Sequence, residues 1–197
     1  MFTYARDYQM KTAILLHGMP SEAGYYDPSR QSQSNEHWFP WLQHELIIRD
    51  ILTQTPEWPK PYAPDYSEWL KLFNQFTVDE DTILVGHSMG AGFLVRWLSE
   101  NDVKVGKVVL VAPSFHQPKQ AVGDFLDFEL DPNMAAKTKG LVVFYSDDDS
   151  DRIMQSVSDL RENVANAGFH EFHGHGHFVF SHMGTREFPE LLEETLR

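Results

Sequence analysis

The sequence predicts an α/β fold, a three-layer α/β/α sandwich around a mostly parallel sheet of about six strands. Short, nearly continuous runs of Val, Ile and Leu recur along the chain, which is typical of strands buried on both faces. Stretches with helical spacing of apolar residues separate these runs. The 197 residues are 42% hydrophobic and 23% charged, which is typical of a globular protein with a sizeable core.

Six segments are expected to form the strands, namely residues 12–16, 46–52 (a weaker candidate), 82–85, 107–111, 141–145 and 169–172. Helical patterns fill the gaps at residues 38–45, 66–76, 91–100, 153–167 and 187–196. Pro40 is expected in the first turn of its helix, and Asp65 is expected to cap the next one. No repeat or linker divides the chain, so residues 1–197 are expected to form a single domain.

Charge and composition argue against several functions. The chain carries 16 Lys and Arg against 29 Asp and Glu, a formal net charge of −13, which disfavours nucleic acids and anionic membranes as partners. It has no Cys, which excludes disulfides, thiolate metal sites and a Cys nucleophile. No apolar run approaches the length of a membrane span, and the first residues lack the apolar core of a signal peptide. We therefore expect a cytoplasmic protein.

The strongest motif is Gly-His-Ser-Met-Gly at residues 86–90, between an expected strand and an expected helix. This strand–turn–helix context is the one that a G-x-S-x-G nucleophile elbow requires. The tight turn strains the serine backbone, and the flanking glycines leave room for neighbouring chain segments. Ser88 is therefore the expected nucleophile, at the positive end of the helix dipole.

A serine nucleophile needs a base, and the chain has ten His. Five of them lie near the end of the sequence: His170, His173, His175, His177 and His182. We expect His177 to be the base, because Gly176 and Phe178 supply a flexible turn and an apolar anchor; His175 is the alternative. His173, His175 and His177 alternate and could instead bind Zn²⁺ or Ni²⁺. Without Cys or an H-E-x-x-H motif, however, no metal site is expected.

The acid that orients the base is expected directly after the strand at 141–145, in the chain order Ser, acid, His. Four carboxylates follow that strand: Asp147, Asp148, Asp149 and Asp151. Most of them are expected to be solvated, and Ser150 or Asp151 could cap the following helix. The residues alone leave open which carboxylate faces the base.

Stabilisation of an oxyanion requires N–H donors beside the nucleophile. The backbone N–H of Met89 is expected to supply one, and that of Met19, after the first strand, the other. His17 could line the substrate pocket or simply pack at the strand end. Trp38 could likewise serve the pocket or the core, and we expect Phe115 and Phe125 to line an apolar acyl pocket. The long loop at residues 113–139, which carries both Phe, is expected to set substrate choice.

Several stretches resemble those of a known family. They are residues 14–18, 36–42, 86–90, 146–149 and 176–178, and the most specific is the His-Trp-Phe-Pro-Trp-Leu run at 37–42. They resemble the small α/β-hydrolase-fold serine hydrolases typified by retinoblastoma-binding protein 9 and its bacterial YdeN-like relatives. The resemblance covers most of the chain and implies a minimal fold without a cap domain. It also implies a Ser-Asp-His triad, carried here onto Ser88, Asp149 and His177.

The sequence thus predicts a serine hydrolase that cleaves small carboxylic esters or thioesters through an acyl-enzyme, without a cofactor. Amidase or peptidase activity uses the same triad. The alternative is a catalytically silent module on the same fold that binds a protein partner through its aromatic residues. The sequence predicts neither the acyl length nor the oligomeric state.

Overall fold

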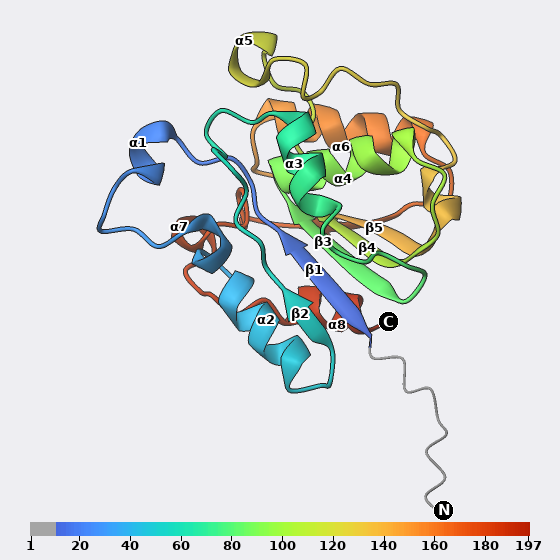
Figure 1. Ribbon diagram of the computed structural model, residues 1–197, viewed down its shortest axis with the longest axis horizontal. Coiled ribbons are helices and arrows are strands. Elements are labelled where there is room, and N and C mark those ends of the chain that lie inside the picture. Colours follow the sequence, from blue (N-terminus) through green and yellow to red (C-terminus); the bar gives the residue numbers. More distant parts are fainter. Residues whose placement is uncertain (1–10) are drawn as a thin grey trace, which may run out of the picture.

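A computed structural model describes residues 11–197 (Figure 1). Six strands form one sheet in the order β2-β1-β3-β4-β5-β6, and every neighbouring pair is parallel. The strands are β1 (Thr12–Leu16), β2 (Leu52–Gln54), β3 (Thr82–His87), β4 (Val105–Val111), β5 (Thr138–Ser146) and β6 (Gly168–Phe172). The predicted fold class is therefore confirmed.

Helices cover both faces of the sheet (Figure 1). On one face lie α2 (Phe39–Ile47) and α8 (Pro189–Leu196), and on the other lie α3 (Tyr66–Phe73), α4 (Met89–Glu100) and α6 (Asp151–Asn163). Short helices lie in the loops: α1 (Glu22–Tyr25), η1 (Gln33–Asn35), α5 (Lys119–Val122), η2 (Met134–Lys137) and α7 (Phe180–Met183). The resulting sandwich leaves the carboxyl edge of the sheet to its loops.

The core explains why the strand sequences are so apolar. All six residues of β3 are buried, because helices pack on both of its faces. On the α3–α4 side, Trp58 stacks on Trp69 with ring centroids 4.2 Å apart, and Phe93 lies 5.0 Å from Trp58. Large aromatic side chains thus fill the space between these helices and the sheet.

Each expected element except the second strand is present, although α3 ends at Phe73 and not at 76, and α6 ends at Asn163 and not at 167. Asp65 caps α3 as expected, because its side chain accepts a hydrogen bond from the N–H of Glu68. The strand expected at residues 46–52 is wrong, since α2 runs to Ile47 and β2 begins at Leu52. Leu46 is buried as the last apolar contact of α2, so its apolar character reflects helix packing.

Within residues 11–197, no helix has the length and apolar character needed to cross a membrane. Residues 1–10, which contribute to the expectation that the chain has no signal peptide, lie outside the described residues.

Candidate active site

Ser88 lies at the sharp turn between β3 and α4, with φ of 54° and ψ of −120°. Such a conformation costs a residue other than glycine on the order of 1–3 kcal/mol and needs support from its surroundings. The N–H of Ser88 donates to the carbonyl oxygen of Val111 at 2.9 Å, and its own carbonyl accepts from Gly92 and Ser114. These bonds hold the strained turn against β4 and α4.

The two glycines of the motif are required by close packing. A Cβ atom on Gly86 would lie 2.7 Å from the Cα of Ala91, and one on Gly90 would collide with the carbonyl oxygen of Leu16. Because those neighbours are backbone atoms, they cannot move aside cheaply. The G-x-S-x-G spacing therefore lets α4 begin directly against β1.

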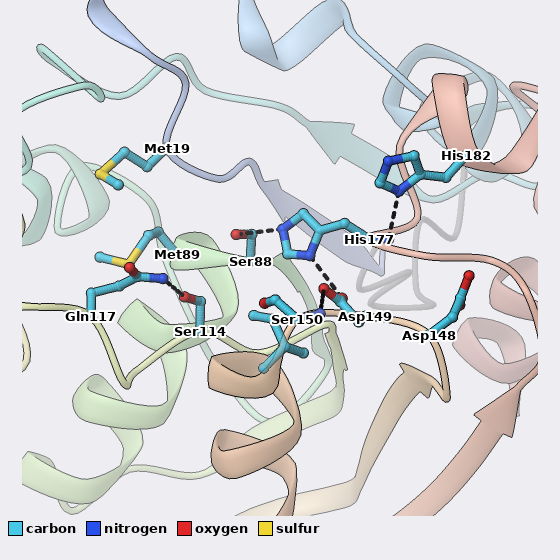
Figure 2. Close-up of a pocket in the computed structure, with 11 residues that line it drawn as sticks. Met19, Ser88, Met89, Ser114, Gln117, Asp148, Asp149, Ser150, His177 and His182 are labelled. Carbon is cyan, nitrogen blue, oxygen red and sulfur yellow. Dashed lines mark hydrogen bonds and ion pairs between the residues drawn. The ribbon is translucent and has the colours of Figure 1, made fainter.

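His177 lies in the loop after β6 and contacts both other residues expected to act with it (Figure 2). Its Nε2 atom is 2.9 Å from the hydroxyl oxygen of Ser88, and its Nδ1 atom is 2.8 Å from a carboxylate oxygen of Asp149. A carboxylate accepts hydrogen bonds, so Nδ1 carries the proton and Nε2 can accept the proton of Ser88. The fold thus brings together three side chains that are distant in the sequence. Asp149 lies 61 positions after Ser88, and His177 lies 28 positions after Asp149.

Asp149 is enclosed, with a side chain only 4% exposed. One of its oxygens faces His177, and the other accepts a hydrogen bond of 2.7 Å from the N–H of Ser150. Both oxygens are therefore held in place.

Two of the three neighbouring carboxylates have other partners. Asp147 pairs with the exposed ring of His173 at 2.7 Å, and Asp151 is the first residue of α6. Asp148 accepts from the hydroxyl of Ser146 at 2.6 Å and from the N–H of Gly176 at 2.8 Å. The bond from Ser146 is the main reason why the pKa of Asp148 lies below its usual value. Asp148 is exposed, as expected, and it also ties β5 to the loop that carries His177.

The alternating histidines do not converge on one point. His173 pairs with Asp147, His175 bonds the carbonyl oxygen of His173 at 3.0 Å, and His177 faces Ser88. Across residues 11–197, no three His, Cys, Asp or Glu side chains are arranged to hold a metal ion.

Met19 and Met89 line the same cavity as Ser88 (Figure 2). Their backbone N–H groups donate no hydrogen bond to any group in the described part of the chain. Met89 is the first residue of α4, where N–H groups lack partners within the helix. Both groups are thus free to bind an oxygen atom beside Ser88.

The cavity measures about 410 Å³ and is of mixed polarity. Its walls are formed by Met19, Ser88, Met89, Ser114, Gln117, Asp148, Asp149, Ser150, Ile153, His177 and His182. The prediction that Trp38 and Phe125 line the pocket is wrong, because both are fully buried in the core. Phe115 is not in its wall either, since its ring packs beside those of His116 and Phe128. The loop after β4 contributes Ser114 and Gln117 instead.

His17 is buried next to the site and lines a smaller cavity of about 70 Å³ beside Ser88. Its Nε2 accepts from the N–H of Trp58 at 3.0 Å, so its Nδ1 carries the proton and donates to the carbonyl of Gly18 at 2.8 Å. Burial lowers the pKa of His17, which keeps the ring neutral. The ring thereby fixes the turn that leads to Met19.

Two histidines that the sequence did not link to the main chain of His177 hold it in place. The Nε2–H of His87 donates to the carbonyl oxygen of His177 at 2.8 Å. The N–H of His177 donates to Nδ1 of His182 at 2.9 Å. His87 fills a variable position of the G-x-S-x-G motif, and no pattern in the sequence links it to the loop 90 residues later.

Comparison with known proteins identifies the family of this chain. A family model described as "Serine hydrolase" matches residues 25–194. YdeN of Bacillus subtilis (strain 168) is 28% identical over 156 residues, which cover 76% of this chain and 82% of YdeN. The crystal structure of the ydeN gene product from B. subtilis superposes with a TM-score of 0.78 at 25% identity, covering 93% of this chain and 95% of that one.

More distant structures share the fold. Est1E from Butyrivibrio proteoclasticus, solved with bound ferulic acid, has a TM-score of 0.64 at 13% identity and covers 94% of this chain and 86% of its own. The family match spans most of the sequence and includes the nucleophile elbow as well as the loop that carries His177. This chain therefore belongs to the serine hydrolase family and is an enzyme of the α/β-hydrolase fold.

Proposed function

We propose that the protein hydrolyses small carboxylic esters or thioesters through an acyl-enzyme on Ser88. The observation that carries this proposal is the position of the His177 ring, 2.9 Å from the hydroxyl of Ser88 and 2.8 Å from the carboxylate of Asp149. That arrangement activates a serine hydroxyl without a cofactor.

In the first half of the reaction, the hydroxyl oxygen of Ser88 attacks the substrate carbonyl carbon while its proton passes to Nε2 of His177. Asp149 holds the Nδ1–H and stabilises the imidazolium that forms. The carbonyl oxygen becomes an oxyanion that accepts hydrogen bonds from the N–H groups of Met19 and Met89. When this intermediate collapses, Nε2–H protonates the leaving alcohol or thiol and the acyl group stays on Ser88.

In the second half, a water molecule gives its proton to Nε2 of His177 and attacks the acyl carbon. Collapse of the second intermediate returns the proton to Ser88 and releases the carboxylic acid. The enzyme ends in its starting state.

The size and charge of the cavity support a small, uncharged substrate. Its volume of about 410 Å³ suits a small molecule. Asp148 and Asp149 lie in its wall, and the whole chain carries a net charge of −13, so an anionic acyl group is disfavoured. Met19, Met89 and Ile153 provide apolar contacts for the acyl chain, and Ser114 and Gln117 provide polar ones.

A fluorophosphonate probe and a series of p-nitrophenyl esters from acetate to decanoate test this proposal. We expect the wild-type protein to be labelled and to turn over the shorter esters, and Ser88→Ala to lose both properties while its circular dichroism spectrum stays the same. Equal labelling of Ser88→Ala would refute the assignment of the nucleophile. A folded wild-type protein that is neither labelled nor active would favour the silent binding module.

A further inference from the structure

We propose that His87 is a positioning residue, whose buried imidazole anchors the main chain of His177 so that the His177 ring stays between Ser88 and Asp149. The inference rests on the proposed function, because it assigns a role relative to His177 as the base. It adds a residue that does not touch the substrate and acts through the residue that does.

The anchor joins two parts of the site that lie 90 positions apart in the sequence. His87 is the last residue of β3, directly before Ser88, and is only 3% exposed. Its partner across the sheet is Val111 of β4, so its backbone is fixed by the central strands. The bond of 2.8 Å to the carbonyl of His177 therefore ties the loop after β6 to the strand that carries the nucleophile.

The loop needs such an anchor because no regular structure supports it. β6 ends at Phe172, and Gly174, Gly176 and Phe178 then take positive φ angles of 70°, 50° and 52°. Neither the N–H nor the carbonyl of His177 belongs to a helix or strand. Instead, His182 accepts from the N–H and His87 donates to the carbonyl, so both main-chain polar groups are bonded to imidazole rings (Figure 2 shows His182).

The protonation state of His87 follows from its partner. A carbonyl oxygen can only accept, so Nε2 of His87 must carry a proton. Burial holds the pKa of His87 well below its usual value, and nearby His177 and His37 act in the same direction, which keeps the ring neutral. The rings of Trp38 and Phe39 lie edge-on, with centroids 5.8 and 6.2 Å away, and limit rotation of the imidazole. His87 is thus a rigid, uncharged donor.

Three substitutions of His87 distinguish its role as a hydrogen-bond donor from its role in packing. Glutamine places its amide nitrogen at about the reach of Nε2, asparagine is one methylene too short, and leucine has no donor. We expect His87→Asn and His87→Leu to lower kcat on the order of 10-fold to 100-fold, since a misplaced base slows the chemical step. KM should change little, because His87 lines the smaller cavity of about 70 Å³ and not the larger one proposed to hold the substrate. His87→Gln should retain most of the activity.

A spectroscopic readout tests the mechanism directly. The Nδ1–H proton of His177, bonded to Asp149, should give a low-field proton NMR signal in the wild type and in His87→Gln. That signal should broaden or vanish in His87→Asn and His87→Leu, while urea unfolding verifies that each variant is folded. His44, an exposed residue of α2, supplies the matched control, since His44→Asn and His44→Gln should leave activity and signal unchanged.

Several outcomes would overturn the proposal. Folded Asn and Leu variants with wild-type kcat would show that the anchor is unnecessary, and a Gln variant as slow as the Asn variant would show that the donor is not what matters. If the variants fail to fold, ¹⁵N NMR of the wild-type ring still decides, because a proton on Nδ1 instead of Nε2 would rule out the bond. Labelling of the wild-type protein at Ser88 keeps these outcomes separate from a failure of the proposed function.

Discussion

Asp149 differs from the neighbouring carboxylates in what its two oxygens contact. One faces Nδ1 of His177 and the other is held by the N–H of Ser150, inside a nearly closed environment. Asp147 and Asp151 lie at the surface, with exposed side chains. Local sequence treats these acids alike, so their difference in role comes from the fold alone.

Asp149→Asn should lower kcat/KM on the order of 10⁴-fold, because the amide no longer favours the tautomer that leaves Nε2 free to accept a proton. Asp151→Asn is the matched control on the same loop and should retain nearly full activity. The measurement is kcat/KM for p-nitrophenyl acetate. If Asp151→Asn were the inactive variant, the register of the triad would be wrong.

Asp148 is expected to act through the loop. Asp148→Ala removes the acceptor shared by Ser146 and Gly176, which frees the segment before His177. We expect kcat to fall on the order of 10-fold to 100-fold, less than for Asp149→Asn. Asp148→Asn keeps an acceptor oxygen and should restore most of the rate. Equal rates for Asp148→Ala and the wild type would show that this anchor is dispensable.

In the segment between β4 and β5, some residues lie in the cavity wall and others lie in the core. Ser114 and Gln117, near its start, line the cavity, and Gln117 donates to the hydroxyl of Ser114 at 2.8 Å. Phe125, further along, is fully buried, with its ring 4.8 Å from that of Trp69. We therefore expect the first residues of this segment to influence substrate choice, while its buried apolar residues anchor it.

Gln117→Leu should favour longer acyl chains, since an apolar side chain replaces a polar one in the cavity wall. We expect the ratio of kcat/KM for decanoate over acetate esters to rise on the order of 10-fold. Phe125→Ala is the contrasting variant. It should lower the free energy of unfolding by about 3–5 kcal/mol and leave that ratio unchanged. If the ratio shifted in Phe125→Ala and stayed the same in Gln117→Leu, the assignment of Gln117 to the cavity wall and of Phe125 to the core would be contradicted.

At the scale of the whole molecule, we expect buried and partly buried histidines to determine how stability responds to mild acid. The pKa values of His17, His37 and His87 are all lowered, mainly by burial, and that of His37 falls to about 4. Arg186, His177, Arg30 and His182 also disfavour a charge on His37. In the unfolded chain these histidines have their usual pKa values. As the pH falls below about 6.5, the unfolded state therefore binds more protons than the folded state does. Stability should therefore decline between about pH 6.5 and 4.

His37→Asn should weaken this decline, on the order of 1–2 kcal/mol between pH 7 and 4, after allowance for solvent screening of a partly buried ring. Asparagine can still accept the hydrogen bond that Nδ1 of His37 receives from Phe180 and suits its positive φ of 56°. The measurement is urea unfolding at several pH values. The pKa values of Asp65 and Asp131 are lowered, so these residues affect stability mainly below about pH 4 to 5. An unchanged slope between about pH 6.5 and 5 in His37→Asn would therefore contradict this attribution.

The sequence by itself predicted five of the six strands and pointed to Ser88 as the nucleophile, because both depend on local patterns. Continuous apolar runs mark doubly buried strands, and the elbow is a five-residue motif whose glycines are required by backbone contacts. The strand order, by contrast, and the separation of Asp149 from Asp148 depend on which segments pack together.

Only the tertiary structure showed which residues hold His177 in place and which residues form the walls of the cavity. His87, His182 and Asp148 meet that loop through contacts that carry no sequence signature. Trp38 and Phe125 satisfy the composition of a pocket wall equally well, yet both lie in the core. The physical reason is that an apolar side chain gains the same free energy against a core or a ligand, so only the surrounding chain determines which it meets.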